Sequence, residues 1–376
     1  MVWAFAKADV HVAMLYKAVT IEAMQQELRV FNPQELANIV WAFAKAGVHD
    51  EQFYEAVANE AVQRQLHGFD PQNLGNMTWA FATMGVRLDR FYEAVADEAV
   101  RQELRGFSPQ HLANIVWAFA KVGVYSKELY KAVADEAVRQ QLRGFKPQEL
   151  INIVWAFATV GVRADKLYVA VADAAVRQQL RGFNHQNLAN MVWAHAVANI
   201  HHEALFEAFY QILSQPLVVT GFSKEQLSSI HQWLIWLELE NNLPDNKLSL
   251  LGVIRYQCQE AIQDCSVHTS KLQCNVGAIL ADVHPGFEEE FIDSRTSYSI
   301  DLALNSLRIA VEVDGPSHFI TWLGNKSSKT MNGATVFKHR LLIAAGWKVV
   351  NLAYYEWGAL PDKHQKKEYL EGLLYK

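Results

Sequence analysis

The hydrophobic pattern of the first 222 residues repeats every 38 residues. Six tryptophans keep this spacing: Trp3, Trp41, Trp79, Trp117, Trp155 and Trp193. Other positions keep it too: Phe31, Phe69, Phe107, Phe145 and Phe183, then Pro33, Pro71, Pro109 and Pro147, with His185 in the fifth proline place. Self-similarity at a fixed period is the signature of stacked supersecondary units, so the pattern predicts a repeat protein.

Each unit predicts two helices. In the unit after residue 31, Asn32 is placed to cap a first helix, with Pro33 at its first position and Glu35 closing a capping box. We expect this helix to run to about Ala46 and to end at Gly47, where a left-handed residue is favoured.

Asp50 is placed to cap a second helix, which we expect to run to about Leu66. Its apolar side chains recur at helical spacing from Tyr54 through Val57 to Ala61. A single hairpin could not bury both apolar faces alone, so neighbouring hairpins must stack. The sequence therefore predicts an α-solenoid over residues 1–222.

The repeat decays after Phe183, because His195 replaces the phenylalanine of the unit and Val197 replaces its lysine or threonine. Residues 222–227 restart a degenerate unit, in which Trp233 and Trp236 echo the tryptophan ladder. Helices are expected at 224–239, 248–263 and about 270–280. We predict capping and linker helices over 223–285 and a separate α/β domain over 286–376.

In that last domain the pattern changes to a period of two, which predicts strands at 287–292, 299–304 and 308–313. A turn at 314–318, a basic helix at 335–345 and a strand at 347–352 are expected to follow. Successive strands that carry carboxylates, followed by a helix, are typical of the restriction-endonuclease-like PD-(D/E)xK fold.

Three carboxylates fall on or beside these strands, namely Asp301, Glu312 and Asp314. Because Mg²⁺ prefers oxygen ligands, they are the candidate metal-binding and catalytic residues, and the ion would orient water for phosphodiester cleavage. The catalytic lysine of the pattern is replaced by Asp314, and Lys338 is the candidate substitute. In the alternative interpretation these carboxylates pair with His318, Lys338 or Arg340 as a polar core.

A polar stripe follows the first helix of each repeat, since Gln34, Asn38, Trp41 and Lys45 lie within about 60° of one another on a helix of 3.6 residues per turn. Two columns of the stripe are constant: Gln34, Gln72, Gln110, Gln148 and Gln186, and Asn38, Asn76, Asn114, Asn152 and Asn190. Two columns vary: Glu35, Asn73, His111, Glu149 and Asn187, and Lys45, Thr83, Lys121, Thr159 and Val197.

A constant frame with varying polar positions suits a reader of one RNA base per repeat, and the tryptophans could stack unpaired bases. We therefore predict that these columns bind single-stranded RNA. Two alternatives stay open: the tryptophans pack between repeats as core, and the asparagines bond the neighbouring repeat's backbone. A protein-binding scaffold is the third possibility.

The formal net charge of −6 excludes a generally polycationic nucleic-acid binder. No apolar run approaches the ~18 residues of a membrane helix, so no membrane partner is expected. Residues 2–8 match residues 40–46 one for one, so the chain begins inside a repeat. We interpret this as a fragment or a misplaced start, with any targeting peptide upstream.

The repeat unit, for example FNPQELANIVWAFAKAGV at 31–48, resembles octotricopeptide repeats, which are 38-residue helical repeats of organellar RNA-processing factors. The resemblance covers about residues 1–222. It implies sequence-specific binding of single-stranded RNA in the mitochondrion or chloroplast, together with other RNA-processing proteins.

The C-terminal segment resembles the RAP domain, an RNA-associated domain of organellar proteins, through YSIDLAL (298–304), IAVEVDGPSHF (309–319), NGATVFKHRLLIAAGWKVV (332–350) and YYEW (354–357). Its candidate RNA contacts are His318, Lys338, Arg340, Lys348, Tyr355 and Trp357. The resemblance implies RNA processing, including rRNA processing, stabilisation or translation control. The alternative is a metal-dependent RNA endonuclease directed by the repeats.

Overall fold

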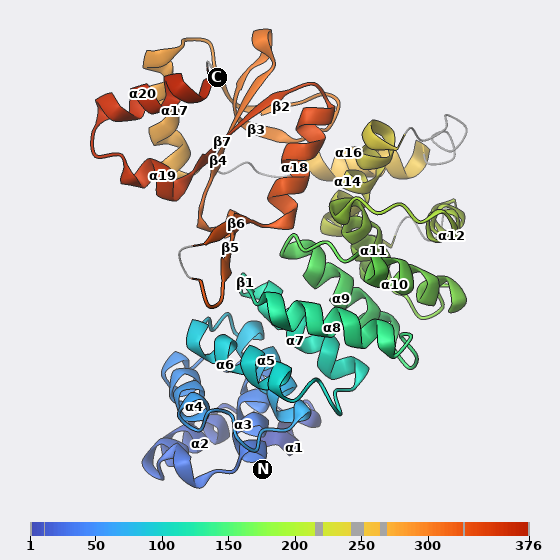
Figure 1. The fold of residues 1–376 in the computed structure, drawn as a ribbon, viewed down its shortest axis with the longest axis vertical. Coiled ribbons are helices and arrows are strands. Elements are labelled where there is room, and N and C mark those ends of the chain that lie inside the picture. The colour runs from blue at the N-terminus through green and yellow to red at the C-terminus, as the bar shows by residue number, and fades with distance from the viewer. Residues whose placement is uncertain are drawn as a thin grey trace. The chain divides into compact units, whose positions relative to one another are not determined.

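The chain folds into two compact units in the computed structural model, which describes residues 2–10, 12–214, 221–241, 252–263, 269–325 and 328–374 (Figure 1). The first unit holds Met1–Phe183 and Ile320–Thr330. The second holds Asn184–Phe319 and Met331–Lys376. The division into 1–222, 223–285 and 286–376 stays a prediction.

Every complete repeat of the first unit begins with a helix that starts at its proline. These first helices are α3 (Pro33–Lys45), α5 (Pro71–Thr83), α7 (Pro109–Lys121) and α9 (Pro147–Thr159), and a partial one is α1 (Val2–Lys7). The capping box of α3 is confirmed, because Asn32 Oδ1 accepts from the Glu35 N–H at 2.9 Å and Glu35 accepts from the Asn32 N–H at 2.8 Å. Gly47, with φ of 67°, follows its end as predicted.

The second helices are shorter than the sequence suggested. They are α4 (Glu51–Gln63), α6 (Asp89–Arg101), α8 (Lys127–Arg139) and α10 (Asp165–Arg177), preceded by α2 (Ala13–Gln25) and η1 (Leu28–Val30). Asp50 caps α4 as predicted, but the helix ends at Gln63 and not near Leu66. Gln65 and Leu66 have positive φ, which turns the fully buried Leu66 back into the core. Burial of this leucine therefore overrides the helical pattern.

Successive first helices pack directly against one another, α3 on α5, α5 on α7 and α7 on α9. An aromatic contact repeats at each step, in which a tyrosine of one second helix meets a phenylalanine of the next first helix. The pairs are Tyr16–Phe43, Tyr54–Phe81, Tyr92–Phe119 and Tyr130–Phe157, with ring centroids 5.3, 5.7, 5.2 and 4.9 Å apart. All eight rings are buried, so these pairs form the core between hairpins. The helical repeat region is therefore a stack of hairpins.

A small sheet in the first unit has no counterpart in the sequence analysis. Strands β5 (Phe319–Trp322) and β6 (Lys329–Met331) pair with each other, and β5 pairs in parallel with β1 (Val124–Tyr125) in the turn after α7. Trp322 lies against Tyr125, with ring centroids 4.9 Å apart. These strands have only two to four residues, and β1 joins β5 across a long stretch of sequence, so no local hydrophobic period marks them.

The second unit opens with helices that continue the repeat in degenerate form: α11 (His185–Ala198), α12 (Glu203–Leu213), α14 (Lys224–Glu240) and α16 (Gly252–Gln263). Helix α14 confirms the prediction for 224–239 and packs along α11. Trp233 and Trp236 are fully buried, so they are core residues and do not continue the half-exposed ladder. Of the predicted helix 248–263, residues 248–251 lie outside the described part of the chain.

The mixed α/β part follows the order helix, three strands, helix, strand, two helices. Its elements are α17 (Lys271–Val283), β2 (Glu288–Ile292), β3 (Ser299–Leu304), η2 (Asn305–Leu307), β4 (Ile309–Asp314), η3 (Pro316–His318), α18 (Gly333–Ala344), β7 (Lys348–Ala353), α19 (Tyr354–Ala359) and α20 (Lys363–Leu374). The sheet runs β2-β3-β4-β7, antiparallel except for the parallel pair β4–β7. The predicted strands and basic helix are confirmed to within about two residues.

Two apolar layers enclose this sheet (Figure 1). One face carries Val311 and Val313 of β4 against α17, α19 and α20. The other carries Ala310 of the same strand against Leu342 of α18. Because side chains alternate along β4, Glu312 and Asp314 face the α18 side together with Ala310. The strand register thus sets where the carboxylates lie.

The aromatic contact between repeats predicts a large loss of stability on truncation. We expect Phe119→Ala to lower the free energy of unfolding by ~3–5 kcal/mol, because it empties a fully buried site against Tyr92. Urea unfolding followed by circular dichroism measures this change. A loss below ~1 kcal/mol would contradict a packed interface between these hairpins.

Candidate nucleic-acid interface and carboxylate cluster

The polar stripe lies on the accessible side of the first helices. Gln34, Gln72, Gln110, Gln148 and Gln186 are all exposed, while Asn38, Asn76, Asn114, Asn152 and Asn190 are half-buried. The tryptophans from Trp41 to Trp193 are also half-buried. Each first helix therefore buries its leucine and phenylalanine face and leaves this stripe open.

Most amides of the two constant columns have no protein partner. No hydrogen bond to another described residue is made by the side-chain amides of Asn38, Asn76, Asn114 and Asn190, or by those of Gln34, Gln72, Gln110 and Gln186. In the fourth repeat Gln148 Nε2 donates to Asn152 Oδ1 at 2.7 Å. Within the described residues, therefore, these asparagine side chains do not bond the neighbouring repeat's backbone, and except at Asn152 their donors and acceptors stay available to a ligand.

One variable column has a different task in the structure. Glu35, His111, Glu149 and Asn187 each accept a hydrogen bond from the backbone N–H three residues earlier and so close the capping box of their own helix. Asn73 is buried and only its backbone N–H is bonded to the cap residue, Asp70. Glu, His and Asn can all serve this purpose, so capping accounts for the variation in this column.

The second variable column is the more accessible. Lys45, Thr83 and Lys121 are exposed at the far end of the stripe, and Thr159 is half-buried. Val197, in the degenerate repeat, is buried. The column that alternates between cation and hydroxyl is thus exposed in the first three complete repeats and half-buried in the fourth.

Two successive tryptophans of the ladder contact each other. The rings of Trp41 and Trp79 have centroids 6.3 Å apart and are inclined by 36°. Trp193 donates its indole N–H to Gln232 of α14 at 2.9 Å. These rings are half-buried, so each is packed in part and accessible in part, and the stacking of bases on them stays a prediction.

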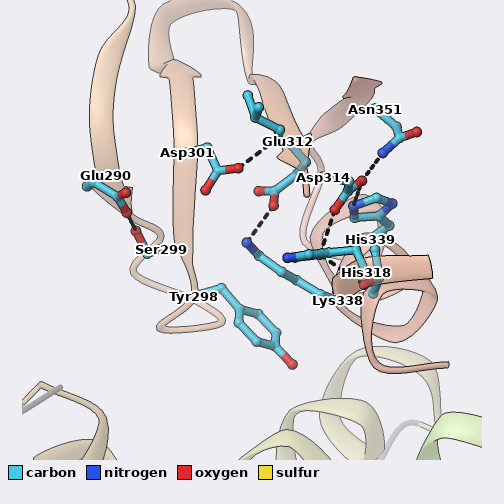
Figure 2. A network of polar contacts seen from close by, with 12 residues as sticks. Glu290, Tyr298, Ser299, Asp301, Glu312, Asp314, His318, Lys338, His339 and Asn351 are labelled. Atoms are coloured by element: carbon cyan, nitrogen blue, oxygen red, sulfur yellow. Dashed lines mark hydrogen bonds and ion pairs between the residues drawn. The ribbon is translucent and has the colours of Figure 1, made fainter. Parts of the chain in front are cut away.

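The predicted carboxylates converge on the α18 face of the sheet (Figure 2). Asp301 comes from β3, and Glu312 and Asp314 come from β4. Asp301 Oδ2 accepts from the Val313 N–H at 2.7 Å. The three side chains are buried or half-buried, which is costly for charged groups unless they are paired.

Glu312 is paired with Lys338, the lysine that the sequence offered as a substitute. Lys338 Nζ lies 2.5 Å from Glu312 Oε2, and the other oxygen, Oε1, is buried without a hydrogen-bond partner. Burial raises the pKa of Glu312 to about 7, although the Lys338 charge lowers it, because desolvation outweighs the attraction. The pKa of Lys338 is raised by the carboxylates around it, despite its burial.

Asp314 is satisfied by three groups. Its Oδ1 lies 2.8 Å from His318 Nδ1, and Oδ2 accepts from the side-chain amide of Asn351 and lies 3.8 Å from His339 Nε2. The contact with Asp314 raises the pKa of His318, while burial lowers the pKa of His339. Asp314 is therefore part of a polar core, as the alternative interpretation proposed, and contributes less to any open site.

The fit for Mg²⁺ rests on Asp301 and Glu312. Within the described residues no three His, Cys, Asp or Glu side chains lie close enough together to hold a metal ion. Mg²⁺ often keeps several waters and takes only one or two protein carboxylates, so the unpartnered Oε1 of Glu312 beside Asp301 is compatible with it.

The candidate RNA contacts of this domain do not form one surface. Arg340 donates to Glu240 and to the carbonyls of Ala196 and Val197, and Lys348 donates to the Leu374 carbonyl at 3.0 Å. Trp357 is 2% exposed and its indole N–H binds Asn275. These three residues hold the fold together. His318 and Tyr355 remain accessible, whereas Lys338 is half-buried in its pair with Glu312.

Two neighbours of the cluster were missed by the sequence analysis. Glu290 of β2 accepts from Ser299 at 2.5 Å and from Gln273 at 2.7 Å, and Asn351 of β7 reaches Asp314 (Figure 2). Both residues lie on strands that the alternating hydrophobic pattern predicted. Only the pairing of those strands with β3 and β4 brings Glu290 to Asp301 and Asn351 to Asp314. No local sequence signal marks them.

A stack of helical hairpins with an open polar stripe, followed by a mixed α/β domain, defines the class of this protein. None of its described helices is long and apolar enough to cross a membrane. Residues 1–215 match the family described as RNA-editing substrate-binding complex 6 protein, and residues 311–373 match the RAP domain.

Because that first match covers more than half of the chain, the chain belongs to this family, and it carries a RAP domain at its C-terminus. A curated relative is the "RAP domain-containing protein, chloroplastic" of Oryza sativa subsp. japonica, which is 38% identical over 107 residues. The match covers 28% of this chain and 16% of the relative. The resemblance to octotricopeptide repeats stays a prediction.

The Glu312–Lys338 pair predicts a pH-dependent stability. With a folded pKa of about 7, above the ~4.3 of an unfolded glutamate, the folded state holds a proton that the unfolded chain has lost between these values. The free energy of unfolding should therefore fall by at most ~3 kcal/mol as the pH rises from about 5 to 7. Urea unfolding over this range measures it.

The control is the double variant Glu312→Gln/Lys338→Met, which keeps the volume and removes both charges. We expect its pH profile to lack this decline, and the difference between the two proteins isolates the pair. Parallel profiles of both proteins would contradict the raised pKa of Glu312.

Proposed function

We propose that this chain binds single-stranded RNA through the stripe of its first helices. The observation that carries the proposal is the row of unpartnered amides, Asn38, Asn76 and Asn114 with their glutamine neighbours, repeated at constant spacing on an accessible face. Primary amides can hydrogen-bond to base edges in two directions at once, so they suit nucleobases.

The half-exposed tryptophans support the same ligand. A base stacked on an aromatic side chain is stabilised by ~1–3 kcal/mol whatever its identity. The varying column from Lys45 through Thr83 and Lys121 to Thr159 would then carry the differences between repeats. In this proposal each repeat contacts about one base, as in other modular helical RNA readers.

The role we propose is organellar RNA maturation, stabilisation or translation control, rRNA processing included. The family matched over residues 1–215 carries RNA editing in its description, and the rice relative, a RAP domain-containing protein, is named as chloroplastic. We favour the chloroplast over the mitochondrion on that name. We further propose that the chain works with other RNA-processing proteins, because the name of its family refers to a complex.

A second candidate function is metal-assisted RNA cleavage in the RAP domain. The order α17, β2, β3, β4, α18, β7, with carboxylates on β3 and β4, keeps the pattern that the sequence shares with restriction-endonuclease-like folds. The specific observation in its favour is the unpartnered, buried Oε1 of Glu312 beside Asp301 and Lys338. When bound there, Mg²⁺ would supply an activated water.

If the amide columns bind RNA, removing two of their side-chain amides should lower the affinity for RNA. We expect Asn76→Ala/Asn114→Ala to weaken binding to a preferred single-stranded RNA at least ~10-fold, since a good amide–base pair is worth about 1–3 kcal/mol. Fluorescence anisotropy at ~0.15 M salt, first with an RNA pool and then with its selected sequence, measures this.

The matched control is Asn59→Ala/Gln63→Ala, which removes two exposed amides from the second helix α4. Its affinity should equal that of the unaltered chain. Equal losses in both variants would remove the stripe from the interface, and a chain that binds none of the RNAs would leave only the protein-scaffold interpretation.

The carboxylate cluster predicts Mg²⁺-dependent cleavage that Asp301→Asn abolishes while RNA affinity is retained. Asp282→Asn serves as control, because this exposed carboxylate of α17 pairs only with Lys363 and Lys367. Gel analysis of end-labelled RNA with and without Mg²⁺ is the measurement. Bound RNA that stays intact, or cleavage that persists in Asp301→Asn, would remove the second function.

A further inference from the structure

A basic column runs along one edge of the repeat stack, outside every residue considered so far. The same position of successive repeats holds Arg29, His67, Arg105, Arg143 and Arg181, all of them exposed. Each precedes the turn that leads into the next first helix. The chain as a whole carries a net charge of −6, so a column with one basic side chain per repeat is a local exception.

The backbone fixes where these side chains start. The glycine after the basic residue has positive φ at Gly68, Gly106, Gly144 and Gly182. In three repeats this glycine lies against the first proline of the repeat's own first helix, and the separation from an added Cβ to the Pro Cγ would be 3.8 Å for Gly68, 3.9 Å for Gly106 and 3.6 Å for Gly182. The basic residue therefore projects from the edge at which the first helices begin.

A second contact holds the same loop. The side-chain amides of Gln102, Gln140 and Gln178 donate to the carbonyls of Phe69, Phe107 and Phe145, just before the cap of the first helix. The end of each second helix is thus tied to the start of the first helix in its own repeat. This places the basic column beside the exposed glutamines that begin the amide stripe, Gln72, Gln110 and Gln148.

The cations of the column differ in how free they are. Arg29 and Arg105 contact Glu27 and Glu103, which are exposed themselves. Arg143 and Arg181 make no ion pair with any described residue. Nearby acidic groups of the first helices are engaged with backbone N–H groups, as for Glu35, Asp70 and Glu149.

We propose that this column is the phosphate track of the interface: one basic side chain per repeat contacts the backbone of the single-stranded RNA whose bases lie on the amide and tryptophan stripe. The inference rests on the proposed function and adds how the RNA lies on the stripe. Its sugar-phosphate backbone follows the edge where the first helices begin, and its bases lie along those helices. Backbone contacts position a strand without reading its bases, so a column that holds a basic residue in every repeat, arginine in four and histidine in one, fits this edge.

The test uses the full chain and compares two double variants that remove the same charge. Arg143→Gln/Arg181→Gln alters the column, and Arg90→Gln/Lys166→Gln removes two exposed cations from the second helices α6 and α10. Anisotropy with the selected single-stranded RNA between ~0.05 and 0.3 M salt gives the slope of log K against log salt.

Each phosphate contact to a single strand contributes about −0.7 to this slope. We expect the column variant to have a slope smaller in magnitude by ~1.4, with unchanged base preference, while the control keeps the slope of the unaltered chain. Arg143→Lys/Arg181→Lys should restore most of the slope, because lysine also neutralises phosphate as a point charge.

Three results would overturn the proposal, and they are distinguishable. If the unaltered chain binds RNA and both double variants change its slope equally, the track is wrong and the proposed function stands. If RNA does not bind at all, the proposed function fails and the track fails with it. Poly-glutamate serves as a second anionic probe: equal affinity for it and for RNA, lost equally in the column variant, would mark the column as a surface for acidic protein and would also overturn the proposal.

Discussion

The structure of the first unit depends on one contact that recurs between hairpins, the edge of a second-helix tyrosine against a first-helix phenylalanine. In the pair Tyr92–Phe119 both rings are buried and meet at 89°. Such a contact adds about 0.5–1.5 kcal/mol to the burial of the rings themselves. Because no hairpin can satisfy it alone, each repeat depends on its neighbour, and the stack is stable only as an array.

The same contact determines what the stack displays. With leucine and phenylalanine turned inward, the opposite side of each first helix carries its glutamine, asparagine and tryptophan outward in register with the next repeat. The register comes from the packing of the helices. In the first three complete repeats the side-chain amides make no hydrogen bond to another described residue, whereas Gln148 donates to Asn152 in the fourth. An accessible polar face of this kind is a direct consequence of the way the repeats bury their aromatic rings.

The sequence sufficed for whatever is encoded locally. The start of a helix was predicted from Asn32, Pro33 and Glu35, and a strand was predicted from the alternating residues around Ile309 to Val313. Prediction from the sequence failed where a contact between residues far apart in the chain determines the structure. The end of α4 is set by burial of Leu66, Trp357 is taken into the core by α20 and α17, and β5 pairs with β1, which lies far away in the sequence.

The candidate site divides in the same way. Helical periodicity predicted the positions of the amide columns. It could not predict whether the amides lack hydrogen-bond partners, because that depends on the neighbouring backbones. The variation at Glu35 and His111 suggested base reading, although a capping box tolerates the same residues. The basic column before the glycine turns was visible in the repeat all along, yet only the packing of Gly68 on Pro33 shows which edge it follows.

The most direct test of the central claim is to photocrosslink a selected single-stranded RNA that carries 4-thiouridine and to map the attached peptides by mass spectrometry. The account predicts that crosslinks fall on α5, α7 and α9, at the tryptophan and asparagine positions, in an order that follows the repeats. Crosslinks confined to the second helices α6, α8 and α10 would contradict it, because those helices would then carry the RNA-binding face.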